Sequence, residues 1–183
     1  MPISAPLTTP AVIWTIGHST RPIEAFLSLL TGSSIEVIAD VRSFPSSKRY
    51  PQYGKEALTE TLAAHGVGYQ WLPSLGGRRK PSPDSPNTGW RNASFRGYAD
   101  YMSGPEFARG QSQLLEISNK SRTAIMCSEA VWWRCHRSMI ADALCVLGIE
   151  VVHMLDAKHS VPHPMTSPAR IVAGVLSYAA GRK

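Results

Sequence analysis

Long apolar runs are missing from this sequence, and it contains few cysteines. No segment approaches the roughly 18 consecutive apolar residues that span a bilayer, so we expect no membrane partner. Three cysteines, an odd number, do not make a disulfide framework and suit a reducing compartment. Residues 1–10 have no basic start and no apolar core, which excludes the pattern of a signal peptide. Together these absences predict a soluble, cytoplasmic protein.

Acidic residues are also few. Thirteen Asp and Glu stand against nineteen Lys and Arg, which gives a net charge of +6 and an isoelectric point near 9.5. Such an excess favours anionic partners, namely phosphates, nucleic acid or an acidic protein. The alternative is a basic surface that only maintains solubility. With 183 residues, 43% of them hydrophobic, the chain fits one well-packed domain and is too apolar for global disorder.

Apolar runs and amphipathic segments alternate along the chain. Strands are predicted at 12–17, 36–41, 67–72, 122–127 and 150–155, and helices after Thr20 and at 55–65, 94–103, 105–118 and 135–147. Thr20 is the predicted N-cap of the first helix. This alternation predicts an α/β fold: a single domain over 12–183 with a mostly parallel central sheet of about five strands flanked by helices. Residues 1–11 form a loose lead-in, and 170–178 fits either a helix or a strand.

Two irregular stretches, 42–53 and 73–92, combine basic and aromatic residues. The second is long for a loop inside a compact domain, and such loops tend to be lids or binding loops. The basic residues are Lys48, Arg49, Arg78, Arg79, Lys80, Arg91 and Arg96, and the aromatic residues are Tyr50, Tyr53, Trp71, Trp90, Phe95 and Tyr98. Positive charge with stacking surfaces is typical of a nucleotide or nucleic-acid site. Alternatively, the aromatic side chains anchor the loops to the core.

Polar residues follow four of the five predicted strands. Ligands of open α/β sheets bind outside the carboxyl ends of parallel strands, so we expect these residues to form one site. Candidate acid–base residues or nucleophiles are His18, Asp40, Cys127, Glu129, Cys135 and His136. Candidate substrate-binding residues are Ser19, Thr20, Arg42, Gly76, Gly77, Arg78 and Arg137. Each residue alone has a structural alternative, because a histidine after a strand, a Gly-Gly pair or an aspartate beside an arginine often serves only the fold.

The segment from Cys127 to Arg137 allows three interpretations. A cysteine near the start of a helix can have a lowered pKa and act as a nucleophile. However, the gap from Cys127 to Arg137 is too long for a phosphatase loop, and bulky residues fill it. A metal site formed by Cys127, Cys135 and His136 lacks the paired spacing of usual zinc ligands, although Asp40 or Glu129 could complete it, and we assign no metal there. Finally, both cysteines can be core residues, as we expect for Cys145.

These motifs resemble those of the domain of unknown function 488 family. The residues that carry the resemblance are Thr15–Thr20 (TIGHST), Asp40-Val41-Arg42 with Pro45, Leu75–Arg78 (LGGR), Cys127–Glu129 with Cys135–Arg137, and a tail from His163 to Tyr178. Met165 and Ala173 depart from the expected pattern of that tail. The resemblance covers roughly residues 14–178. It implies an α/β architecture and a single site formed by these motifs, and it assigns no reaction.

The leading hypothesis is an enzyme that acts on a phosphate-bearing substrate, a nucleotide or nucleic acid. Arg42, Arg78 and Arg137 would bind anionic oxygens, and His18, Asp40, Glu129 and His136 would transfer protons. Cys127 or Cys135 would be the nucleophile of a covalent mechanism. The alternatives are a non-catalytic nucleic-acid-binding module and a thiol-dependent redox or sulfur-handling protein. The sequence identifies no cofactor and no oligomeric state.

Overall fold

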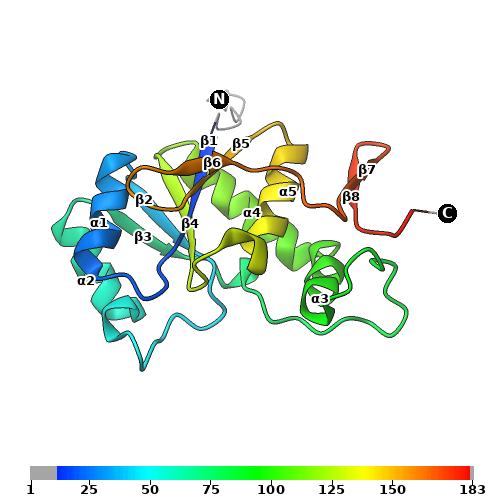
Figure 1. Cartoon of the computed structure of the whole chain (residues 1–183), viewed down its shortest axis with the longest axis horizontal. Helices are drawn as coiled ribbons and strands as arrows, with labels where there is room; N and C mark the ends of the chain where they lie inside the picture. The colour runs from blue at the N-terminus through cyan, green and yellow to red at the C-terminus, as the bar shows by residue number, and fades with distance from the viewer. Residues whose placement is uncertain (1–11, 182–183) are drawn as a thin grey trace, which may run out of the picture.

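The apolar segments form a six-stranded sheet in the computed structural model, which describes residues 12–181 (Figure 1). The strands are β1 (Val12–Gly17), β2 (Val37–Asp40), β3 (Gly68–Trp71), β4 (Thr123–Cys127), β5 (Glu150–Met154) and β6 (Ser160–Pro162). Their order is β3-β2-β4-β1-β5-β6, and only β6 is antiparallel to its neighbour. The α/β fold and all five predicted strands are confirmed. The predicted lead-in, 1–11, lies outside the described residues.

Five helices flank the sheet. They are α1 (Ile23–Gly32), α2 (Lys55–Ala64), α3 (Ala93–Met102), α4 (Pro105–Ser118) and α5 (Arg137–Val146), with short 3-10 helices at Pro51–Tyr53, Pro73–Leu75 and Trp132–Arg134. Phe26 of α1 and Leu58 of α2 belong to one buried apolar cluster, whereas Leu114 of α4 and Met139 of α5 belong to another. Two separate clusters are expected when helices cover both faces of a sheet. Within residues 12–181, no helix is long and apolar enough to cross a membrane.

The start of α1 differs from the sequence prediction. Pro22 occupies the N-cap position, and no side chain caps the helix, so the prediction of Thr20 as N-cap is wrong. A proline ring disfavours the helical conformation of the residue before it, which is Arg21 here. The helix therefore cannot extend back to Thr20, and that side chain is left exposed in the loop after β1.

The C-terminal segment is extended. Strands β7 (Arg170–Val172) and β8 (Val175–Ser177) form a hairpin whose turn places Ala173 and Gly174 at φ 49° and 78°. A hairpin turn with two positive φ values favours glycine at one or both positions. Figure 1 shows this hairpin near the C-terminus, at the opposite end of the molecule from α1 and α2. The structure thus selects the strand alternative for 170–178.

The centre of the sheet brings two polar loops together. Strands β1 and β4 are neighbours, and Gly17 pairs with Cys127 at their carboxyl ends. The main-chain N–H groups of His18 and Ser19 then donate to the carbonyl oxygens of Cys127 and Ser128, at 3.0 Å in both cases. A Cβ atom on Gly17 would lie 1.9 Å from the Glu129 carbonyl oxygen, so only glycine permits this contact. The loops after β1 and β4 therefore form one rigid rim.

Candidate functional site

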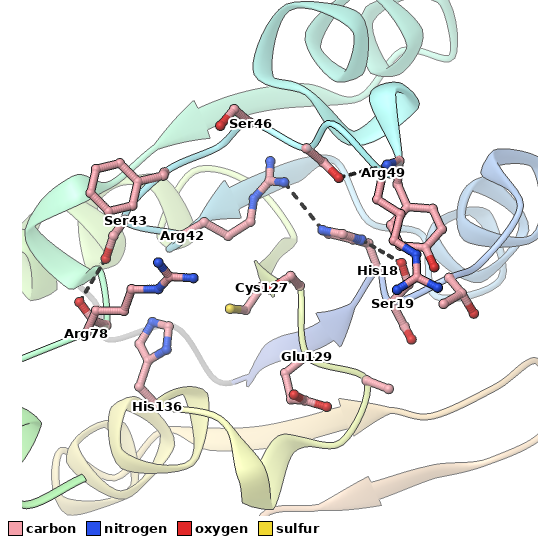
Figure 2. A pocket seen from close by; sticks show the side chains of 17 residues that line it. His18, Ser19, Arg42, Ser43, Ser46, Arg49, Arg78, Cys127, Glu129 and His136 are labelled. Carbon is pink, nitrogen blue, oxygen red and sulfur yellow. Dashed lines mark hydrogen bonds between the residues drawn. The ribbon is translucent and has the colours of Figure 1, made fainter. Parts of the chain in front are cut away.

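A cavity of about 550 Å³ opens at the carboxyl ends of β1, β2 and β4. This is the edge of the sheet at which the sequence places its candidate residues, and Figure 2 shows several of them, including His18, Arg42, Arg78, Cys127, Glu129 and His136, arranged around the cavity. The lining residues are His18, Ser19, Thr20, Arg42, Ser43, Phe44, Ser46, Ser47, Arg49, Tyr50, Gly77, Arg78, Cys127, Ser128, Glu129, Ala130 and His136. Three of these are arginines, whereas Glu129 is the single acidic side chain among them.

The structure divides the predicted site residues into two groups. Nine of them line the cavity: His18, Ser19, Thr20, Arg42, Gly77, Arg78, Cys127, Glu129 and His136. The other four, Asp40, Gly76, Cys135 and Arg137, are buried and are not among the lining residues. The residues of the second group contact residues of the first, so their contribution to the cavity is indirect.

Asp40 holds Arg42 in place. Its side chain is fully buried and accepts hydrogen bonds from Arg42 Nε at 2.9 Å and Arg42 Nη2 at 2.6 Å, from the Arg42 main-chain N–H, and from the Tyr69 hydroxyl at 2.6 Å. Arg42 Nη1 also donates to the Tyr53 carbonyl oxygen at 2.8 Å. With its carboxylate fully engaged, Asp40 acts as a positioning residue for Arg42 and lacks the solvent access of a proton-transfer group.

His18 is a neutral side chain with a fixed tautomer. Its Nδ1 lies 3.0 Å from the Ser19 carbonyl oxygen, which can only accept, so Nδ1 carries the proton. Nε2 then has an unprotonated lone pair that accepts a hydrogen bond from Arg42 Nη1 at 3.4 Å. Burial, together with the charge of Arg42, lowers the pKa of His18 to about 4. The ring also stacks on Tyr53, so His18 orients Arg42 at the cavity wall.

Arg137 braces the loop after β4 from behind. Its guanidinium donates to the Glu129 carbonyl oxygen at 2.5 Å and to Thr15 Oγ1 at 3.3 Å, and its side chain is buried. These contacts direct the side chain to the protein interior. The fork of donors that sequence reasoning assigned to substrate oxygens therefore binds the backbone that carries Glu129.

Two arginines at the cavity are held less tightly. In the described part of the chain, no hydrogen bond or ion pair engages the guanidinium of Arg49 or Arg78, and both side chains are exposed. Figure 2 shows the Arg78 guanidinium directed toward Cys127 and His136. Arg78 and Ser19 also have positive φ values, of 61° and 48°. Strained backbone of this kind often occurs at functional sites. Ser19 and Arg78 line the cavity, whereas Ser34 and Ala173, which also have positive φ values, are not among its lining residues.

The loop after β2 supplies four lining residues that sequence reasoning did not assign to the site: Ser43, Phe44, Ser46 and Ser47. It also supplies Tyr50, which the sequence placed among the aromatic residues of a nucleotide or nucleic-acid site. The Phe44 side chain is 68% exposed although it is large and apolar. An exposed aromatic ring at the edge of a polar cavity is suited to stacking on a flat ligand. The Ser-rich, Pro-rich composition indicated a loop, but nothing in it indicated which side chains face the cavity.

The two cysteines behind His136 have opposite acidities. Burial opposes ionisation of Cys135, but a hydrogen bond from Cys127 and the charge of Arg137 outweigh it and lower the pKa to about 6. For Cys127, the hydrogen bond to Cys135 and burial both favour the neutral thiol, and they raise the pKa of Cys127 to about 12. Only Cys127 lines the cavity. The thiol that faces the cavity is thus the one that ionises less readily.

A buried polar chain that the sequence did not indicate runs behind the site. Thr15 Oγ1 lies 2.6 Å from His153 Nδ1, His153 Nε2 lies 2.9 Å from His163 Nδ1, and His163 Nε2 lies 2.9 Å from Asp142 Oδ1. Trp132 stacks on His153 at 4.4 Å between ring centroids. A histidine within the apolar run of β5 was the one available signal, since a buried imidazole needs partners for both nitrogens. This series of hydrogen bonds fastens the C-terminal segment to α5.

The long loop at 73–92 is packed against α3. Asp100 of α3 accepts hydrogen bonds from Ser82, Ser85 and Asn87, and Arg79 lies 3.7 Å over the Tyr101 ring. Among the interleaved aromatic residues, Tyr53 and Tyr98 are buried, and Trp90 and Phe95 pack against the core. These rings anchor the loops, so stacking at the cavity is left to Phe44 and Tyr50.

The fold and the cavity define an α/β protein with a cationic site at the carboxyl ends of a parallel sheet. Residues 22–144 match the family described as "Domain of unknown function DUF488". The match spans more than half of the chain, so the chain belongs to this family. It begins after the His18–Thr20 motif and ends before the C-terminal tail, and the assignment of those two segments to the family stays a prediction. No curated protein and no solved structure matched the chain.

Proposed function

We propose that this protein is an enzyme that hydrolyses a phosphate-bearing substrate, a nucleotide or the terminal nucleotide of a nucleic acid. The observation that carries the proposal is the lining of the cavity, with three arginines, several hydroxyl groups and one carboxylate. Guanidinium groups match phosphate oxygens in shape and charge, and they stabilise the charge that develops in phosphoryl transfer. The phosphate would contact Arg49 and Arg78, because their donors have no partner among residues 12–181, and Arg42 at its remaining donor.

The number of donors on Arg42 limits its part in binding. A guanidinium has five N–H groups, and Asp40, Tyr53 and His18 take four of them. One Nη2 hydrogen is left for a ligand, and the adjacent Asp40 carboxylate neutralises the charge of Arg42. The net positive charge of the cavity therefore comes from Arg49 and Arg78.

Glu129 is the residue to which we assign proton transfer. It is the sole carboxylate lining the cavity, its side chain is exposed, and Arg137 fixes its main chain. In the proposed reaction Glu129 takes a proton from the attacking water, a new phosphorus–oxygen bond forms, and the bond to the leaving group breaks. The proton then passes to the leaving oxygen. Phe44 supports a nucleotide as substrate, because its exposed ring offers a stacking surface for a base.

The two alternative functions have less support. A thiol-dependent enzyme would use Cys127, the accessible thiol, whose pKa is raised to about 12. A nucleic-acid-binding module would rely on Arg49, Arg79 and Lys80, of which Arg49 alone lines the cavity, and on aromatic rings that are largely packed in the core. The proposed phosphate-binding enzyme instead uses side chains that line a single cavity.

Replacing Glu129 with Gln tests the assigned role. A panel of nucleoside mono-, di- and triphosphates and a 5′-phosphorylated oligonucleotide is incubated with the protein, and the products are separated by ion-exchange chromatography. We expect the variant to lose about 100-fold in kcat with a KM within a few-fold of wild type, because general acid–base catalysis contributes at least this much. Glu60→Gln, on the exposed surface of α2, is the matched control. Absence of turnover by the wild type on every substrate, or full activity of Glu129→Gln, would refute the proposal.

A further inference from the structure

Three side chains with metal-binding atoms meet beside the cavity, two of them on its wall. The sulfur atoms of Cys127 and Cys135 and a ring nitrogen of His136 all lie within 4.8 Å of one another. Cys135 Sγ is 3.6 Å from His136 Nδ1. Ligands of a tetrahedral zinc ion, with metal–ligand bonds of about 2.0–2.3 Å, are separated by roughly 3.5 Å. The three atoms are thus already near the spacing that one metal ion requires.

The tautomer of His136 leaves the correct nitrogen free. His136 Nε2 lies 3.0 Å from the Val41 carbonyl oxygen, and a carbonyl can only accept, so Nε2 carries the proton. The unprotonated Nδ1 is then the atom that faces Cys135. A metal-binding histidine is commonly held in this way, with its other ring nitrogen donating to a backbone carbonyl. A histidine that served only as a packing residue would not need this orientation toward two thiols.

Gly77 keeps the space beside Nδ1 clear. A Cβ atom at this position would lie 2.9 Å from His136 Nδ1 and 3.2 Å from Cγ. Gly77 has no positive φ value, so its backbone conformation does not demand glycine. The close approach to the imidazole is the structural reason for glycine at this position, and it leaves the lone pair of Nδ1 accessible.

We propose that Cys127, Cys135 and His136 bind one divalent metal ion that prefers thiolate and imidazole ligands, with Zn²⁺ as its representative. Binding forms two metal–sulfur bonds and one metal–nitrogen bond, and the thiol protons of Cys127 and Cys135 are released to solvent. Because Cys127 and His136 line the cavity, the fourth coordination position faces the cavity, as in catalytic zinc sites. This inference differs from the sequence analysis, which assigned no metal because the three ligands lack the paired spacing of usual zinc sites. It is independent of the proposed hydrolysis.

The chemistry of the surroundings supports thiolate ligands. The main-chain N–H of Arg137 is directed at Cys135 Sγ at 3.5 Å, and the buried guanidinium of Arg137 adds positive charge nearby. Two thiolates balance the charge of one divalent ion, so the bound site is electrically neutral in a buried position. Cys145, the third cysteine, lies on α5 outside this cluster and provides an internal control.

The test is titration of the reduced, chelator-treated full chain with Co²⁺, followed by visible and near-ultraviolet absorption. We expect one Co²⁺ per chain with thiolate charge-transfer bands and tetrahedral d–d bands, and displacement of Co²⁺ by one equivalent of Zn²⁺. Cys127→Ser, Cys135→Ser and His136→Gln should each weaken Co²⁺ binding at least tenfold, whereas Cys145→Ser should bind as the wild type does. Circular dichroism reports whether each variant is folded.

Gly77→Ala keeps the test decisive if a ligand variant fails to fold. It retains all three ligands but places a methyl group against Nδ1, so we expect at least tenfold weaker Co²⁺ binding. Absence of Co²⁺ uptake by the reduced wild type would overturn the proposal, as would equal losses in Cys145→Ser and Cys127→Ser. Failure of nucleotide turnover with Co²⁺ binding intact would count against the proposed function alone.

Discussion

Replacing Asp40 with Ala is expected to lower the free energy of unfolding by about 3–5 kcal/mol, the usual result of leaving one partner of a buried ion pair uncompensated. Asp40 and Arg42 are 0% and 5% exposed, so water cannot replace the lost carboxylate. The Tyr69 hydroxyl and the main-chain N–H of Arg42 would lose their acceptor as well. Urea unfolding at neutral pH measures the change.

A second substitution separates the ion pair from simple loss of packing. In Asp40→Ala/Arg42→Met the unpaired charge is gone, so the double variant should recover part of the stability lost in Asp40→Ala. Asp156→Ala, in an exposed pair with His159, is the control and should destabilise the protein far less than Asp40→Ala does. A loss below about 1 kcal/mol for Asp40→Ala would show that Asp40 is not the structural anchor of Arg42.

Acidification is expected to destabilise the protein through two buried histidines. Burial, with the charge of Arg42, lowers the pKa of His18 to about 4; burial, with the charges of His163 and Arg137, lowers the pKa of His153 to about 3. Between pH 6.5 and these values the unfolded chain binds protons that the folded chain excludes. The stability is therefore greatest above about pH 6.5 and falls as the pH decreases. Each histidine should contribute about 2–3 kcal/mol of loss by pH 4.5.

The slope of stability against pH identifies the histidines responsible. Urea unfolding at about pH 7, 6, 5 and 4.5 should show His18→Asn with a clearly flatter dependence than the wild type, because one group that titrates in the unfolded chain is removed. His65→Asn, at the exposed end of α2, should keep the wild-type slope. Identical slopes for His18→Asn and wild type would contradict a neutral, buried His18.

The fold was predictable because its signals are local. The apolar run at Val12–Gly17 and the segment Pro105–Ser118, bounded by Gly104 and a polar turn, match β1 and α4 to the residue. The rule that ligands gather at the carboxyl ends of parallel strands also located the cavity. Both inferences depend on residue order and periodicity, which the sequence contains in full.

Side-chain direction was the part that the sequence did not contain. Asp40 and Arg137 reach the predicted edge of the sheet, but burial and hydrogen bonding turn them away from the cavity. Conversely, Phe44 faces the cavity from a loop whose composition says nothing about orientation. Cys127 and Cys135 are eight positions apart and fit no paired ligand spacing, yet the turn that includes Trp132–Arg134 brings their sulfur atoms together. These contacts depend on tertiary packing, which no local pattern determines.

The central claim is that the cavity binds phosphate, and titration calorimetry of a nucleoside monophosphate against the matching nucleoside tests it most directly. We expect the wild type to bind the monophosphate at least tenfold more tightly, because charge-assisted hydrogen bonds contribute about 1.5–3 kcal/mol each. Arg78→Ala should abolish this preference, whereas Arg91→Ala, which removes the same charge from an exposed site outside the cavity, should keep it. Equal binding of nucleoside and monophosphate by the wild type, or equal losses in the two arginine variants, would contradict the account.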